Sequence, residues 1–251
     1  MAGRHGQWFE YDWPLEGALA RFGVDMALID ADRDLRPLLL YVNCTSRSER
    51  RQQLSSVERA VANALKDKVI KKLSALYVGY IEVDAQIQYY FYIHDDAELD
   101  GAEKMADRTP LLDCTAGAAD EPDWLTYRTL LYPDAAKLQT EQNGEHIALM
   151  EKHGDCLTAV RRVTFTLYFP TEHIMLEFAQ AARMAGFAYS GPVYSPEREL
   201  AYGADIVRLS SLDKRAIDKL TTKAIDLASR YSGEFGEWSS QIIRRRGPLE
   251  Q

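Results

Sequence analysis

The residues best suited to chemistry stand in one short stretch, EHIALMEKHGDC, at residues 145–156. His146 and His153 are seven residues apart, so a helix would place them on one face, and Asp155 and Cys156 follow closely. Imidazole, carboxylate and thiolate groups are the common ligands of zinc. The spacing matches neither H-E-x-x-H nor a zinc-finger pattern. Two interpretations stay open: a metal site, or the polar end of a helix with His153 near the negative end of its dipole.

Other strings with catalytic potential are weaker. The run DADRD at residues 30–34 begins like a calcium loop, but Leu35 and Tyr41 stand where that loop needs a glycine and a glutamate, which favours a charged turn. His94 precedes two aspartates and is either a general base or a surface residue. The phosphate-binding strings G-x-x-x-x-G-K-[ST] and G-x-G-x-x-G and the elbow G-x-S-x-G do not occur. No cofactor and no metal are therefore expected.

Charge is unevenly distributed along the chain. Up to Cys156 there are 17 Lys and Arg against 27 Asp and Glu, a net charge of -10, whereas the remainder carries 13 against 11, a net charge of +2. The acidic part would repel a polyanion, which disfavours direct nucleic-acid binding. An alternative remains at Arg161, Arg162 and the arginines at 244–246, where RNA binding would show a steep salt dependence.

Cysteine usage and hydropathy indicate a cytoplasmic protein. Cys44, Cys114 and Cys156 lie far apart and form no C-x-x-C pair, so reduced thiols are expected. No stretch approaches the ~18 uncharged apolar residues that a membrane-spanning helix needs. The opening MAGRHGQWFEYDW has no apolar run typical of a signal peptide.

The elements that must position these residues begin with strands and one helix. Ser55 and Glu58 form a capping box, which predicts a helix from Ser55 with its apolar residues on one face. The acidic segment 95–120 is expected to be a long connection that includes one helical turn. Segments rich in β-branched and aromatic residues predict two hairpins that share one sheet: residues 24–31 with 37–44, and residues 75–83 with 86–94.

An aromatic stretch, EPDWLTYRTLLYPDAAKLQ at residues 121–139, contains no catalytic residue. Trp124, Tyr127 and Leu131 fall at i, i+3 and i+7, so a helix would present them together. Such a stripe packs on its own sheet or, if reachable, anchors a partner, because tryptophan and tyrosine dominate binding hot spots. Trp124, Tyr127 and the neighbouring Tyr132 are therefore partner-binding candidates, with the core as the alternative.

The C-terminal part has a clearer pattern. A helix is predicted from Asp134 to about His153, and a strand from Arg161, where apolar and polar residues alternate. The elements that follow have the order β-α-β-β-α-β, which is typical of a ferredoxin-like sandwich. We expect two α+β domains with antiparallel sheets, 1–155 and 156–251.

The first part resembles a bacterial family called domain of unknown function 695. The resemblance lies in Trp8–Asp12 (WFEYD), in the segments YVGYIE and YYFYIHD, in Asp123–Pro133 (DWLTYRTLLYP) and in the pair Gly154 and Asp155. It covers roughly residues 8–157. It implies no activity, because the function of that family is unknown.

The second part resembles RraB, the regulator of ribonuclease E activity, in its element order, in Gly186-Phe187 after its first helix and in its late Trp238. The resemblance implies a non-enzymatic bacterial protein that binds the endoribonuclease RNase E and lowers its cleavage of RNA. This module is near neutral where RraB proteins are acidic, and it reads Phe235-Gly236-Glu237-Trp238 where they read near Y-D-G-W. Glu237 and Trp238 are its partner-binding candidates.

The resulting hypothesis is a cytoplasmic regulator that binds another protein, an RNase E-type endoribonuclease, and contributes no catalytic chemistry. The competing hypothesis is a metal-dependent or small-molecule enzyme that uses His146, His153 and Asp155 or a cleft between the domains. The oligomeric state stays open.

Overall fold

The computed structural model describes residues 7–31, 36–48 and 50–244. The chain divides into two compact units, Met1–Pro133 and Asp134–Gln251, and each contains helices and an antiparallel sheet. The predicted α+β class is confirmed. The division precedes helix α3 (Ala135–Lys152), whereas the domain boundary was expected near residue 155.

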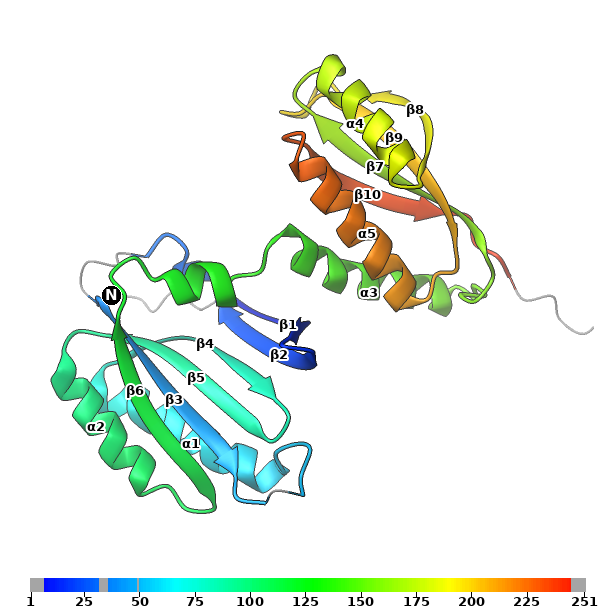
Figure 1. Cartoon of the computed structure of the whole chain (residues 1–251). Coiled ribbons are helices and arrows are strands. Elements are labelled where there is room, and N and C mark those ends of the chain that lie inside the picture. The colour runs from blue at the N-terminus through cyan, green and yellow to red at the C-terminus, as the bar shows by residue number, and fades with distance from the viewer. Residues whose placement is uncertain (1–6, 32–35, 49, 245–251) are drawn as a thin grey trace, which may run out of the picture. The chain divides into compact units, whose positions relative to one another are not determined.

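The first unit is built on a six-stranded sheet with the order β1-β2-β4-β5-β3-β6 (Figure 1). Every pair of neighbouring strands is antiparallel. The strands are β1 (Trp8–Leu15), β2 (Ala18–Asp25), β3 (Leu38–Ser46), β4 (Leu76–Val83), β5 (Gln86–Ile93) and β6 (Leu112–Asp120).

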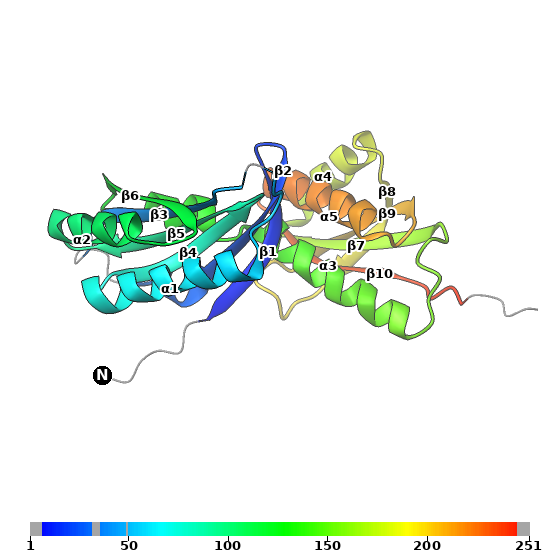
Figure 2. The ribbon, with the colours of Figure 1, turned by 90° about the horizontal axis from the view of Figure 1, so that it is seen from below.

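Two helices, α1 (Ser56–Leu73) and α2 (Asp96–Asp107), pack on one face of this sheet (Figure 2). The predicted capping box at the start of α1 is confirmed, since Ser55 Oγ accepts from the Glu58 N–H and the Glu58 carboxylate accepts from the Ser55 N–H. Leu40 and Phe91 face these helices, and successive side chains of a strand point to opposite faces, so Leu39 and Tyr92 face the other way.

The opposite face is covered by the aromatic stretch. A π-helical turn, Thr126–Leu131, carries Tyr127 and Leu131 onto the sheet, and Trp124 precedes it. Each of these three side chains is fully buried. The first unit therefore has one apolar core on each face of a single sheet.

Two expectations for this unit are wrong. Residues 24–31 do not form a strand that pairs with 37–44: the strand ends at Asp25, whose carboxylate accepts from the Ala27 N–H and caps a short 3-10 helix, Met26–Leu28. The segment 95–120 is not a long connection, because it forms α2 and the edge strand β6. Small residues such as Gly117 gave no strand signal, but β6 pairs with β3 over nine residues and Tyr41 fills the space beside Gly117.

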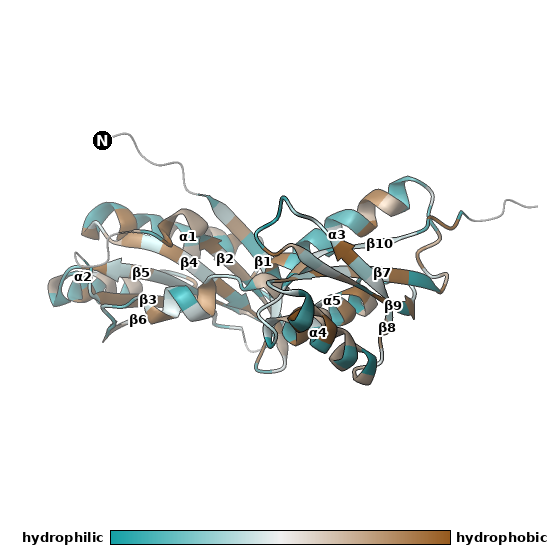
Figure 3. Ribbon diagram, turned by 90° about the horizontal axis from the view of Figure 1, so that it is seen from above, coloured by the Kyte–Doolittle hydropathy of each residue, from teal (hydrophilic) through white to brown (hydrophobic). Residues whose placement is uncertain are grey.

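The second unit has the predicted β-α-β-β-α-β order, and its sheet has the strand order β10-β7-β9-β8. Helices α4 and α5 pack on one face, and hydrophobic residues, brown in Figure 3, alternate with hydrophilic ones along them. The elements are β7 (Arg161–Phe169), α4 (Glu172–Met184), β8 (Ala188–Tyr194), β9 (Tyr202–Ser210), α5 (Lys214–Ser229) and β10 (Glu234–Ser240).

Helix α3 belongs to the second unit because a buried polar residue joins it to α5 and β10. Asn143 is fully buried. Its Nδ2 donates to Asp218 Oδ1 and Thr221 Oγ1, both at 2.9 Å, and its Oδ1 accepts from Trp238 Nε1 at 2.8 Å. Buried amides are stable only when their hydrogen bonds are satisfied, so these contacts specify where α3 packs. In the described part of the chain, none of the helices is long and apolar enough to cross a membrane.

Candidate functional site

Two residues of the candidate metal cluster, His146 and Asp155, make other interactions. The ring of His146 stacks on Trp238 with centroids 4.3 Å apart. Asp155 is buried, and Arg161 Nη1 donates to both of its carboxylate oxygens, at 2.7 and 2.8 Å. His153 ends helix α3 and is exposed. Over the described ranges no three His, Cys, Asp or Glu side chains are placed to share a metal ion. Of the calcium-like run at 30–34, residues 32–34 lie outside those ranges.

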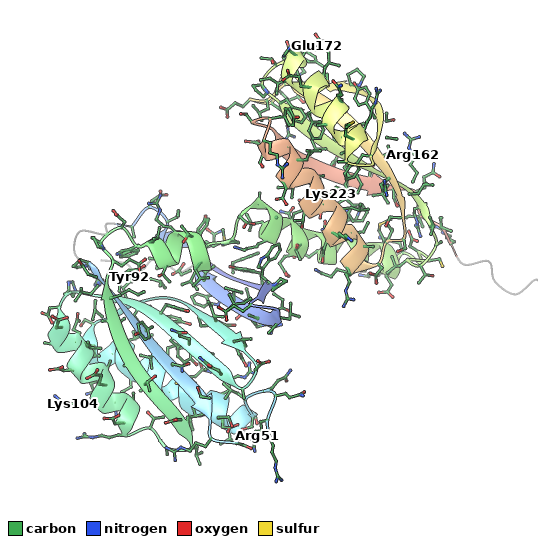
Figure 4. All side chains as sticks on the ribbon, in the orientation of Figure 1. Arg51, Tyr92, Lys104, Arg162, Glu172 and Lys223 are labelled. Atoms are coloured by element: carbon green, nitrogen blue, oxygen red, sulfur yellow. The ribbon has the colours of Figure 1, made fainter. Side chains whose placement is uncertain are left out.

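The aromatic stretch is part of a core. Trp124 stacks on Tyr92, labelled in Figure 4, with centroids 4.2 Å apart, and its Nε1 donates to the Arg36 carbonyl at 2.9 Å. Tyr127 donates through its hydroxyl to the Asp25 carbonyl at 2.8 Å. Since both side chains are fully buried, they cannot serve as exposed anchors in this conformation. Tyr132 is half-buried and packs edge-on against Tyr127.

The two candidates on β10 face opposite sides of the sheet. The strand register shifts at Gly236, so Phe235 and Trp238, three residues apart, both face the helices. Trp238 is only 3% exposed and takes part in the Asn143 network. Glu237 points away from the helices and is exposed. Of this pair, only Glu237 is accessible to a partner.

The arginines proposed for RNA binding are not equivalent. Arg161 is buried, and besides Asp155 its guanidinium donates to the carbonyls of Ala159 and Cys156, so it is unavailable to phosphate. Arg162 (Figure 4) is exposed, and its Nη2 donates to Ser190 Oγ at 2.6 Å. Of the three terminal arginines, Arg244 is exposed and the other two lie outside the described residues.

The face of the second sheet away from the helices is the remaining candidate site. Strand β7 turns Arg162, Thr164, Thr166 and Tyr168 toward it, alternating with the buried core residues. Register places Asp205 and Glu237 on either side of Thr166. We call this surface the open face; it is defined by these β7 side chains, their register partners and Arg198, which stacks on Tyr168. Helices α4 and α5 pack on the other side of the sheet (Figure 1).

At one end of the open face a tyrosine lies flat between two glycines. A β-carbon on Gly236 would lie 2.5 Å from Tyr168 Cε2, and one on Gly203 would lie 3.1 Å from Cε1, so larger residues at these positions would displace the ring. The Arg198 guanidinium lies 4.0 Å above the ring centroid, in cation–π geometry. Tyr168 is only 8% exposed, whereas Arg198, which stacks on it, is exposed.

The polar groups of the open face are of both signs. Arg162 and Arg198 are basic, Asp205 and Glu237 are acidic, and Thr166 Oγ1 donates to Asp205 Oδ1 at 2.7 Å. Phosphate backbones need an excess of positive charge, which this surface lacks. Tyrosine and arginine with a mixed polar rim are typical of protein–protein interfaces.

Sequence reasoning found two residues of this surface, Glu237 as a partner contact and Arg162 as an RNA contact, and missed the Tyr168–Arg198 pair. The alternation along β7 did place Tyr168 on the side opposite the core. What the sequence could not supply is the register that brings Gly203 and Gly236 against the ring, or the position of Arg198 over it.

Comparisons with known proteins agree with both resemblances. Residues 7–132 match the model of a family described as "Family of unknown function (DUF695)", and residues 140–240 match the model "Regulator of ribonuclease activity B". The pair Gly154 and Asp155, assigned above to the first resemblance, falls within the second match.

Among curated proteins nothing matches this chain. Among solved structures, a crystal structure of an unknown protein from Galdieria sulphuraria aligns with 80% of this chain and 96% of its own, at 8% identity and a TM-score of 0.22.

Proposed function

This chain belongs, over half of its length, to the DUF695 family and carries a module matched by the model for regulator of ribonuclease activity B; from this premise we propose a protein-binding regulator of an RNase E-type endoribonuclease. It acts by occupying a surface of the enzyme rather than by chemistry of its own. The observation that carries the proposal is the match at residues 140–240, which spans α3 from residue 140 and the whole four-stranded sheet.

The open face is the contact surface in this proposal. Arg198 is its main anchor, because stacking on the buried Tyr168 ring holds the exposed guanidinium and its hydrogen-bond donors in place. Glu237 and Asp205 supply acceptors for basic groups on the partner. A mixed-charge surface of this kind selects a partner by complementary placement of charges and does not attract RNA in general.

The first unit adds long-range attraction. Met1–Pro133 holds 15 Lys and Arg against 22 Asp and Glu, a net charge of -7, which leaves -1 for the second unit. RNA-processing enzymes carry basic surfaces, so an acidic unit attached to the regulator would raise the association rate at low salt. RraB proteins carry their acidity in the module itself, so in this chain the attached unit takes over that role.

A tagged pull-down with nuclease treatment tests the partner. The full chain is expected to retain an RNase E-type endoribonuclease from the organism that encodes it, identified by mass spectrometry against a tag-only control. Retention that disappears on nuclease treatment would show an RNA bridge and contradict direct protein binding. Enrichment of a different protein alone would remove the RNase E assignment.

Purified components test the surface. Arg198→Glu and Glu237→Lys are expected to weaken inhibition of RNA cleavage at least about tenfold, which corresponds to about 1.4 kcal/mol of binding free energy. Both side chains are exposed, so the variants should fold. Arg215→Glu, an exposed position on α5, has the same charge change as Arg198→Glu, is the matched control for that variant and should inhibit like the wild type. An equal loss of inhibition in the control would show that inhibition depends on the net charge of the chain and not on the open face.

A further inference from the structure

A trough of about 570 Å³ lies in the first unit on the side of the sheet that α1 covers in part. Its walls are one side of α1, with Arg59, Asn63 and Lys66, and the strands β1, β2, β4 and β5. The three α1 residues are spaced i, i+4 and i+7, so they share one face of the helix. The volume falls within the range of small-molecule sites, about 300–1,000 Å³.

Aromatic rings form much of the trough. Trp8 is 41% exposed and stacks on Tyr77 with centroids 5.3 Å apart and on Tyr80 at 6.3 Å, with interplanar angles of 25° and 18°. Tyr80 lies across Gly23, where a β-carbon would be 2.1 Å from Cε1, and its hydroxyl donates to Glu10 at 2.8 Å. The exposed indole is thus held by rings whose positions are fixed.

The lysine in the trough has hydrogen-bonding capacity to spare. Lys66 Nζ lies 5.3 Å from the Tyr77 centroid and 5.9 Å from that of Tyr89. Among the described residues its polar partners are Asn63 Oδ1 and Asp67 Oδ1, each at 3.5 Å, beyond the usual 2.7–3.2 Å of an N–H···O bond.

The other two basic residues of the trough are already paired. Arg59 donates to Glu82 at 2.6 Å, and Arg21 donates to Asp12 at 3.1 Å. Burial raises the pKa of Tyr77 and Tyr89 above the ordinary tyrosine range, so the rings beneath Lys66 stay neutral phenols. Lys66 is therefore the basic group best placed to accept an added anion.

We propose that this trough binds a small planar aromatic molecule that carries one anionic group, with its ring on Trp8 and its anion at Lys66. A cation is disfavoured because the Lys66 ammonium already lies over the tyrosine rings. A polyanion is disfavoured because Glu10 and Glu82 line the same trough. A nucleoside monophosphate and an arylacetate share the required chemistry.

Calorimetric titration of the full chain separates these sources. The probes are AMP and indole-3-acetate, with adenosine as a ring without the anion and inorganic phosphate as the anion without the ring. At least one of the first two is expected to bind with a Kd below about 1 mM, and the ring-only and anion-only probes at least about tenfold more weakly. Binding of AMP alone identifies the phosphate class, and binding of indole-3-acetate alone identifies the carboxylate class.

Two variants test the assigned roles. Trp8→Ala and Lys66→Gln should each lower the affinity for the anionic probe at least about tenfold. Lys66→Gln should also reduce the ratio of that affinity to the affinity for the ring-only probe. Lys71→Gln, an exposed lysine on the same helix, is the matched control and should bind like the wild type. Failure of both anionic probes to bind, or full affinity in Lys66→Gln, overturns the proposal. Ribonuclease inhibition through the second unit is a separate readout and does not depend on this result.

Discussion

Replacing Trp124 by alanine should destabilise the first unit strongly. The side chain is fully buried, stacks on Tyr92 at 4.2 Å and meets Tyr127 edge-on at 6.1 Å. Its indole N–H satisfies the carbonyl of Arg36. Trp124 has a backbone φ of +52°, but alanine also carries a β-carbon, so that strain is common to both residues and does not enter the difference.

The expected cost follows from the cavity and the lost hydrogen bond. Removal of a buried tryptophan side chain typically costs about 3–5 kcal/mol. Against a total stability of about 5–15 kcal/mol, this lowers the Tm of the first unit by roughly 10–20 °C. Trp124→Phe keeps an aromatic ring but leaves the Arg36 carbonyl without its donor, which should cost about 1–3 kcal/mol.

Urea denaturation and calorimetry of the full chain measure these differences. The neighbouring Leu125 is 59% exposed, so Leu125→Ala is the control and should stay within about 0.5 kcal/mol of the wild type. A cost below about 1 kcal/mol for Trp124→Ala would refute the core assignment. Loss of partner binding at unchanged stability would instead make Trp124 a surface anchor.

Three further predictions concern buried charge, pH and thiols. Arg161→Met leaves Asp155 buried and unpaired and should cost about 3–5 kcal/mol in urea denaturation, whereas the exposed Arg162→Met should be nearly neutral. Hydrogen bonds from Ser55 and Ser46 lower the pKa of Glu58 to about 2. The stability that its carboxylate contributes is therefore present above pH 4.5 and is lost as the pH falls toward 2. Glu58→Gln should remove this pH dependence of the free energy of unfolding, and a variant with the pH dependence of the wild type would contradict the assignment. Ellman's reagent should label one thiol, that of Cys156, in the native chain and three after denaturation, because Cys44 on β3 and Cys114 on β6 are buried. Fast labelling of all three thiols in the native chain would contradict this burial.

Much of the local structure could be predicted from the sequence. Ser55, Asp134, Thr171 and Asp213 each cap the helix that follows, because a side-chain oxygen next to free N–H groups is a local signal. The alternation along Arg161–Phe169 likewise predicted a strand with one buried face, which the structure confirms.

Non-local partners decided the rest. Strand β6 consists mostly of small residues, and it forms because β3 offers nine partners in register. Helix α3 was assigned to the first domain, but Asn143 on α3 finds its hydrogen-bond partners on α5 and β10. Neither result leaves a trace in local composition, because each depends on residues far away in the sequence.

The candidate sites divide in the same way. Residue type and spacing singled out Trp124, Trp238, His146 and Asp155, but spacing along a chain does not specify burial. Tertiary packing buried Trp124, Trp238 and Asp155 and stacked the half-buried His146 on Trp238. The Tyr168–Arg198 pair and the trough beside Lys66 depend on strand register and on glycines opposite large rings. The sequence by itself determined the families and, in the second unit, the element types and their order. That Leu112–Asp120 forms a strand, and which side chains meet at a surface, was decided only by the tertiary structure, because register and packing are set by contacts between distant segments.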